Sequence, residues 1–130
     1  MANVVSSQTL LNGARNCVVK VTNLSDGTNE ADVVKVDASA LGLPVDGSYR
    51  LDRLEWAVNS VSGTNSIIKV EWDGSTDALI ASIPPNESGC FDFCKIGGLP
   101  NNATEPTGDI TVTSTLSNLD SYTLIFYMVK

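Results

Sequence analysis

The residue types that catalyse reactions near neutral pH are sparse in this chain. Its 130 residues include no histidine. That absence removes the usual general base and the partner that serine and cysteine nucleophiles need. Carboxylate or lysine chemistry requires a defined arrangement of side chains, and no motif here nominates one. We therefore predict a protein that is not an enzyme and that has no catalytic, metal-binding or cofactor-binding residues.

The three cysteines are Cys17, Cys90 and Cys94, and the last two frame the segment CFDFC. Four residues of a strand span about 13 Å, whereas a disulfide needs Cα atoms within about 7 Å. Cys90 and Cys94 therefore cannot bond to each other unless the segment turns back on itself. Three cysteines without histidine are also one ligand short of a structural zinc site. Free thiols are the simplest expectation, with a disulfide to Cys17 or a bond between subunits as the alternatives.

Two further motifs have both a functional and a structural interpretation. The segment from Asp73 to Asp77, DGSTD, carries acidic residues as a calcium loop does. It lacks the third acidic position, the central glycine and the distal glutamate of an EF-hand, so a hairpin turn explains it better. Trp56 and Trp72 could form a platform on which sugars stack, but each falls on the apolar face of its expected strand. Core packing is the better interpretation for both tryptophans.

The elements that position these residues are predicted from alternation of apolar and polar side chains with a period of two. Five runs show it. Their apolar members are Cys17, Val19 and Val21; Val34, Val36 and Ala38; Leu54, Trp56 and Val58; Ile68, Val70 and Trp72; and Ile110, Val112, Ser114 and Leu116. The polar set of the second run, expected to face water, includes Lys35.

Turn signals separate these runs. They are Asn12–Gly13, Asp26–Gly27, Asp46–Gly47, Ser62–Gly63, Asp73–Gly74, Pro84–Asn86, Gly97–Gly98 and Pro100–Asn102. Their spacing predicts an all-β chain, a single antiparallel β-sandwich or jelly-roll domain over residues 1–130 with about eight to nine strands. A single helical turn is expected within Asp37–Leu43, where Gly42 and Pro44 stop it.

Both ends of the chain are unusually apolar. The segment Tyr122–Lys130 carries apolar residues on both faces, which is typical of a strand that is central between two layers or that contacts a partner. Residues 1–11 are either an arm laid on a neighbouring subunit or an ordinary edge strand. The expected assembly contacts are Val4, Val5, Leu10, Leu11, Tyr127 and Val129.

Charge argues against several classes of partner. The chain has 8 basic and 15 acidic residues, a net charge of −7, and its lysines and arginines are scattered. Nucleic-acid binding requires clustered basic residues, so neither nucleic acid nor an anionic membrane is an expected partner. The sequence MANVVSSQTLL has neither the basic nor the apolar region of a signal peptide, which predicts synthesis in the cytoplasm.

Four blocks of sequence resemble a family of small virion structural proteins of tailed bacteriophages, including cyanophages. The blocks are MANVVSSQTLLNGARNCVVKVT, VEWDGSTDAL, the segment GGLPNNA with the following TGDI, and YTLIFYMVK. They cover rather less than half of the chain, and the family has no catalytic pattern to carry over. The resemblance implies a capsid decoration or cement protein on the outer head surface. Its partners would be the major capsid protein and copies of itself, with trimers as one arrangement that fits a shell, in a virion made in the bacterial cytoplasm. A neck, tail or fibre-associated protein and a carbohydrate-binding module are the alternatives.

Overall fold

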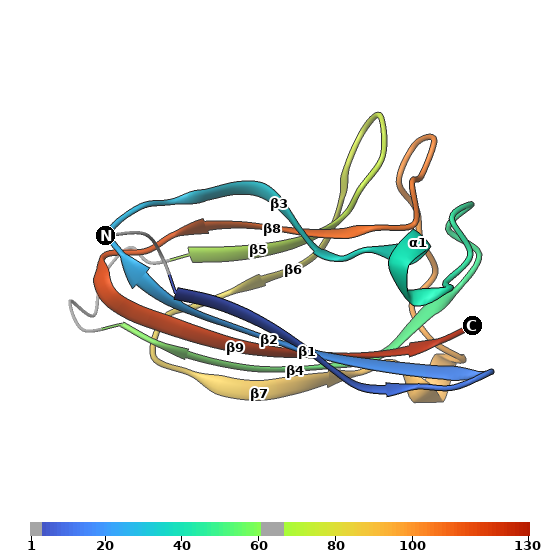
Figure 1. Ribbon diagram of the computed structural model, residues 1–130, viewed down its shortest axis with the longest axis horizontal. Coiled ribbons are helices and arrows are strands. Elements are labelled where there is room, and N and C mark those ends of the chain that lie inside the picture. The colour runs from blue at the N-terminus through green and yellow to red at the C-terminus, as the bar shows by residue number, and fades with distance from the viewer. Residues whose placement is uncertain (1–3, 61–66) are drawn as a thin grey trace.

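The computed structural model describes residues 4–60 and 67–130, which form two antiparallel sheets packed face to face (Figure 1). The five-stranded sheet has the order β1-β2-β9-β4-β7, and the four-stranded sheet has the order β3-β8-β5-β6. The strands are β1 (Val4–Asn12), β2 (Asn16–Asp26), β3 (Glu30–Val36), β4 (Arg50–Asn59), β5 (Ile67–Trp72), β6 (Ala78–Ile83), β7 (Ser88–Asp92), β8 (Ile110–Thr115) and β9 (Asn118–Val129). The turn expected at Ser62–Gly63 lies outside the described residues.

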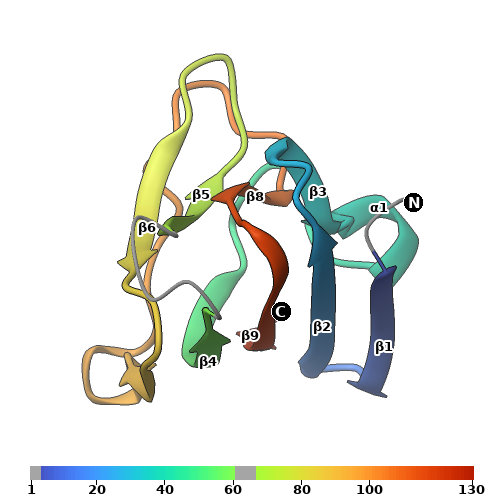
Figure 2. The same cartoon turned by 90° about the vertical axis from the view of Figure 1, so that its left-hand side faces the viewer.

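Strands β2 to β9 follow the order of a jelly roll. One sheet holds β2-β9-β4-β7 and the other holds β3-β8-β5-β6. The strands therefore pair as in a jelly roll: β2 with β9, β3 with β8, β4 with β7 and β5 with β6. Strand β1 adds a fifth strand at the β2 edge of the first sheet (Figure 2). The chain is therefore an antiparallel β-sandwich, as the turn spacing predicted.

The core lies between the two sheets and consists largely of the predicted alternating residues. In β2, Cys17, Val19 and Val21 are buried, and in β9 the same holds for every second residue from Tyr122 to Met128. Strand β9 is central in its sheet, between β2 and β4. Its inner face supplies Leu124 and Phe126 to the core, which accounts for half of its apolar character. The other half lies on the outer face of the sheet.

The prediction for β3 was wrong for Lys35 and Val34. Lys35 is buried, whereas Val34 is 46% exposed. The register of β3 against β8 shifts twice, between Glu30 and Val33 and between Val34 and Val36. Such irregularities reverse the inward and outward sense of a strand. The buried Lys35 ammonium lies 2.6 Å from Glu30, and the Glu30 carboxylate also accepts hydrogen bonds from Tyr122 (2.6 Å) and Ser114 (3.0 Å).

The predicted helical turn is present as α1 (Ala38–Leu41). Asp37 caps its first turn by accepting from the Ala40 N–H, and Gly42 ends it in the left-handed conformation at φ 69°. A second short turn, the 3₁₀ helix η1 (Cys94–Ile96), follows β7. In the described parts of the chain, neither helix has the length or apolar character needed to cross a membrane.

Two loops at one end of the molecule pair with each other (Figure 1). The loop between β5 and β6 bonds to the segment that precedes β8, through Ser75 N–H to Thr104 O (2.8 Å) and Thr104 N–H to Thr76 O (3.1 Å). Gly74 makes this approach possible, because a Cβ there would lie 2.4 Å from the Thr104 carbonyl oxygen. Asp73 accepts from the Thr107 hydroxyl at 2.7 Å. Asp73 therefore links the two loops by a hydrogen bond, which agrees with the predicted hairpin turn.

Candidate functional site

Strand β1 lies at one edge of the five-stranded sheet, and within residues 4–60 and 67–130 no strand pairs with its free side, which we call the open edge. All nine of its residues are exposed, because β1 extends beyond the cover of the other sheet (Figure 2). Its sequence, VVSSQTLLN, has no charged residue and no proline. Soluble proteins usually protect an edge strand with lysine, proline or a covering loop. The open edge of β1 is therefore a surface suited to pairing with another chain.

An apolar surface adjoins this edge on the outer face of the same sheet. The register places Leu11 beside Val18 and Val18 beside Tyr127, so that one row crosses β1, β2 and β9. Leu11, Val18, Tyr127 and Val129 line a hollow of about 340 Å³, together with Asn16, Asp52 and Met128. We call these four apolar residues the outer-face patch. Its members from β9 are the second apolar face of the final strand.

The six predicted assembly contacts are divided by the structure into two groups. Leu11, Tyr127 and Val129 come together at the hollow, although Leu11 is more than a hundred residues from the other two in sequence. Val4, Val5 and Leu10 are 47–59% exposed along β1 and away from that hollow. Leu10 lies at a register shift between Thr9 and Leu11. Val18 was not predicted as a contact, although its place on the polar side of an alternating run was a usable signal.

Polar groups border the outer-face patch on its β4 side. The Arg53 guanidinium carbon lies 5.9 Å from the centre of the Tyr127 ring, and Arg53 is 3.5 Å from Glu55. A hydrogen bond with the Glu55 carboxylate raises the pKa of the Tyr127 hydroxyl above its usual value. An arginine over an aromatic ring beside apolar residues is a composition enriched in protein interfaces.

The two tryptophans differ in their surroundings. Trp72 is fully buried, and its ring meets Tyr49 edge to face at 5.6 Å, which confirms core packing. Trp56 is half-buried and packs against the core from one side. It lies 6.0 Å from Phe91, which stacks on Phe93 at 6.3 Å with an interplanar angle of 14°. These three aromatic residues form a cluster at the β7 edge of the sandwich.

The burial of Trp72 predicts a weak fluorescence response to acrylamide. We expect the native protein to be quenched well below the level of its guanidinium-unfolded form, since Trp72 has no exposed area and Trp56 is half-covered. Stern–Volmer titration of both forms measures this. Equal quenching of native and unfolded protein would show that both indoles lie at the surface.

The cysteines are free thiols in three different settings. Cys17 is buried in the core, and burial raises the pKa of its thiol. Cys90 on β7 and Cys94 in η1 are exposed. The Cys94 thiol donates to the Asp52 carboxylate at 3.0 Å, and this hydrogen bond raises its pKa. A raised thiol pKa lowers the thiolate fraction at neutral pH, so neither Cys17 nor Cys94 has the character of an activated nucleophile.

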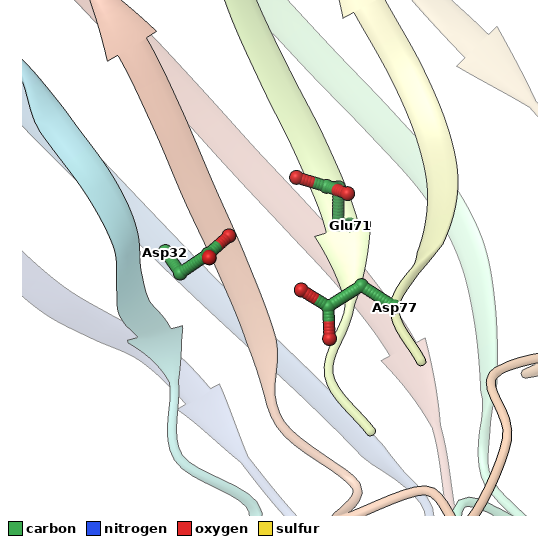
Figure 3. A group of neighbouring side chains, drawn as sticks. All are labelled: Asp32, Glu71 and Asp77. Atoms are coloured by element: carbon green, nitrogen blue, oxygen red, sulfur yellow. The ribbon is translucent and has the colours of Figure 1, made fainter. Parts of the chain in front are cut away.

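Three carboxylates converge on the outer face of the four-stranded sheet. Asp32 of β3, Glu71 of β5 and Asp77 before β6 each place one carboxylate oxygen within 4.8 Å of the other two (Figure 3). We call these residues the acidic cluster. Burial raises the pKa of Glu71, and the nearby charges of Asp32 and Asp77 raise it further. Asp77 shares a sequence segment with Asp73, but the structure places its carboxylate with those of Asp32 and Glu71 instead.

Comparisons with known proteins find distant structural similarity. No family model matches the chain, and no curated protein matches its sequence. Two solved structures of a family 29 carbohydrate-binding module, an arginine-to-alanine and a tyrosine-to-alanine variant, are similar with TM-scores of 0.41 and 0.40. Each is 11% identical; the alignments cover 99% and 98% of this chain and 80% and 79% of theirs. A cupin superfamily protein from Desulfitobacterium hafniense is similar with a TM-score of 0.32 and 9% identity, over 99% of this chain and 79% of its own.

Proposed function

We propose that this chain is a non-enzymatic structural component of a tailed-phage virion, a decoration or cement protein on the outer surface of the head. It would bind the major capsid protein, and copies of itself, through the open edge of β1 and the outer-face patch. This function needs a rigid scaffold and a surface that many symmetry-related contacts can use, and it needs no catalytic group.

The observation that carries the proposal is the open edge of β1. Nine consecutive exposed residues offer unpaired backbone groups and four large apolar side chains, Val4, Val5, Leu10 and Leu11, with no charge among them. In water such an edge is an aggregation hazard. Covered by a neighbouring subunit, the same residues supply backbone hydrogen bonds and apolar burial, as in strand addition.

The arrangement of the resembling sequence blocks supports the same proposal. The first block forms β1 and most of β2, and the last forms most of β9. These three strands are neighbours in one sheet and carry both the open edge and the outer-face patch. The two middle blocks meet where the Thr107 hydroxyl donates to the Asp73 carboxylate at 2.7 Å. The first and last blocks thus share the surface formed by β1, β2 and β9, and the two middle blocks share the paired loops.

The copy number of this protein in purified particles tests the proposal. Antibody labelling and mass spectrometry of virions should find on the order of hundreds of copies on the head, because a decoration protein follows the symmetry of the shell. About a dozen copies or fewer would contradict a decoration role and favour a neck, tail or fibre-associated protein. Absence from the particle would refute a virion function.

A carbohydrate-binding module is the second candidate, and the cluster of Trp56, Phe91 and Phe93 favours it. Phe91 is 38% exposed and stacks on Phe93, so that an aromatic surface is available at the β7 edge. Affinity electrophoresis in soluble polysaccharides tests this role. A module of this kind would be retarded, and Phe91→Ala would remove the retardation. Unretarded migration in cell-wall and capsular polysaccharides of the host would leave the aromatic cluster as edge packing.

A further inference from the structure

We propose that the acidic cluster binds a calcium ion on the outer face of the four-stranded sheet. Asp32, Glu71 and Asp77 come from three different segments, and their carboxylates point toward one another across β8 (Figure 3). Calcium takes oxygen ligands at about 2.3–2.6 Å, so two ligand atoms of one ion lie up to about 5 Å apart. The 4.8 Å limit of the cluster fits that span without movement.

A buried hydroxyl on the residue paired with Glu71 is the second observation that points to a ligand. Thr111 of β8 lies directly opposite Glu71 in the sheet, so both side chains project from the same face. Thr111 is 1% exposed, and its hydroxyl oxygen has no hydrogen-bond partner among the described residues. Buried hydroxyls are almost always paired with protein or with an ordered water. A water molecule bound to the ion would give Thr111 that partner.

The scaffold holds two of the three carboxylates in place. The Asp32 carboxylate accepts from the Thr113 hydroxyl at 3.0 Å, and the Asp32 N–H donates to the same hydroxyl oxygen at 3.0 Å. The Asp77 carboxylate accepts from the Gly74 N–H at 3.1 Å. Each retains a second oxygen that can coordinate an ion. The positive charge of Lys69 offsets part of the negative charge at Glu71. The three carboxylates of the acidic cluster together still carry an excess of negative charge.

Calcium titration of the intact protein tests the site. Calorimetry with CaCl₂ at constant ionic strength should show one ion per chain, with a dissociation constant of about 10⁻⁴–10⁻³ M, the range of weak calcium sites such as those of extracellular modules. Saturating calcium should raise the melting temperature, because an ion that binds only the folded state stabilises it. No saturable heat at ten times that concentration would overturn the proposal.

Two substitutions separate a site from general ion screening. Glu71→Gln should raise the melting temperature in EDTA, since it relieves repulsion, and weaken calcium binding about tenfold or more. Thr111→Val should leave the calcium-free stability intact and also weaken binding. Glu87→Gln, the same change at an exposed residue outside the cluster, should alter neither property. Equal calcium binding by the Glu71→Gln and Glu87→Gln variants would also overturn the proposal.

Discussion

Replacing Lys35 by methionine is expected to lower the free energy of unfolding by about 3–5 kcal/mol. The substitution keeps a long apolar side chain but removes the ammonium that lies 2.6 Å from Glu30. The Glu30 carboxylate would remain buried, with hydrogen bonds from Tyr122 and Ser114 but no cation. An uncompensated buried charge is costly, and that cost is the source of the expected loss. Guanidinium unfolding at pH 7 measures it.

Lys95→Met is the matched control, because Lys95 is exposed in η1 and has no ion pair in the described structure. We expect it to change stability by less than about 0.5 kcal/mol. The double variant Glu30→Gln/Lys35→Met should recover much of the loss, since neither charge then remains and the amide oxygen can still accept from Tyr122 and Ser114. A Lys35→Met protein as stable as wild type would show that Glu30 and Lys35 do not form a buried pair.

The same pair predicts a specific dependence on pH. Burial alone would raise the pKa of Glu30, but the hydrogen bonds from Lys35, Tyr122 and Ser114 hold it below its usual value. A lowered folded-state pKa contributes stability above the unfolded-state pKa, and that stability is lost as the pH falls through the folded-state pKa. Without Lys35, the pKa of Glu30 should rise, so acid should stabilise the variant. The difference in the free energy of unfolding between wild type and Lys35→Met should therefore shrink as the pH falls from neutral to about 4.

Replacing Trp72 by alanine is expected to cost about 3–5 kcal/mol, the range for removing a fully buried tryptophan. The Trp72 ring has no exposed area and packs against Tyr49, whose hydroxyl donates to the Gly108 carbonyl oxygen at 2.6 Å. The cavity would open beside Ile110, the partner of Trp72 across the sheet. Thermal and chemical unfolding of the variant measure the loss.

Trp56→Ala provides the comparison, because Trp56 is half-buried and lies at the β7 edge of the sandwich. Its cost should be clearly smaller than that of Trp72→Ala. This ranking separates core packing from a ligand platform: a tryptophan that served only to stack on sugar could be removed with little loss of stability. Equal stability of wild type and Trp72→Ala would therefore contradict the buried position of this residue.

Much of the fold could be predicted from the sequence because it depends on local signals. Alternation in β2, β5 and β8 placed Val19, Val70 and Val112 in the core, where the structure has them. The turn dipeptides separated the strands and gave their number. The apolar ends of the chain predicted either a central strand or a partner contact for the final strand and an arm or an edge strand for the first; the structure has β9 central and β1 at the edge of the same sheet.

The rest could not be predicted, because it depends on pairing between distant segments. The register shifts of β3 bury Lys35 against Glu30, and alternation alone assigns Lys35 to solvent. The acidic cluster unites Asp32 with residues about forty positions later, and only the order β3-β8-β5-β6 brings them together. Single isolated carboxylates in a sequence carry no signal of this kind.

We propose that the open edge of β1 binds neighbouring subunits of a phage head, and one binding measurement tests this proposal most directly. Heads that lack this protein would be mixed with purified wild type, Ser7→Lys or Ser88→Lys, and the bound copies per particle would be counted. Ser7 lies near the middle of β1, and Ser88 is also an exposed serine, on β7 at the opposite edge of the same sheet. A lysine on an edge strand opposes pairing with another chain.

We predict saturable binding of wild type and of Ser88→Lys at on the order of hundreds of copies per head, with binding by Ser7→Lys weakened about tenfold or more. All three proteins should have the same circular dichroism spectrum. Failure of wild type to bind heads, or equal binding by Ser7→Lys and wild type, would contradict attachment through the open edge of β1.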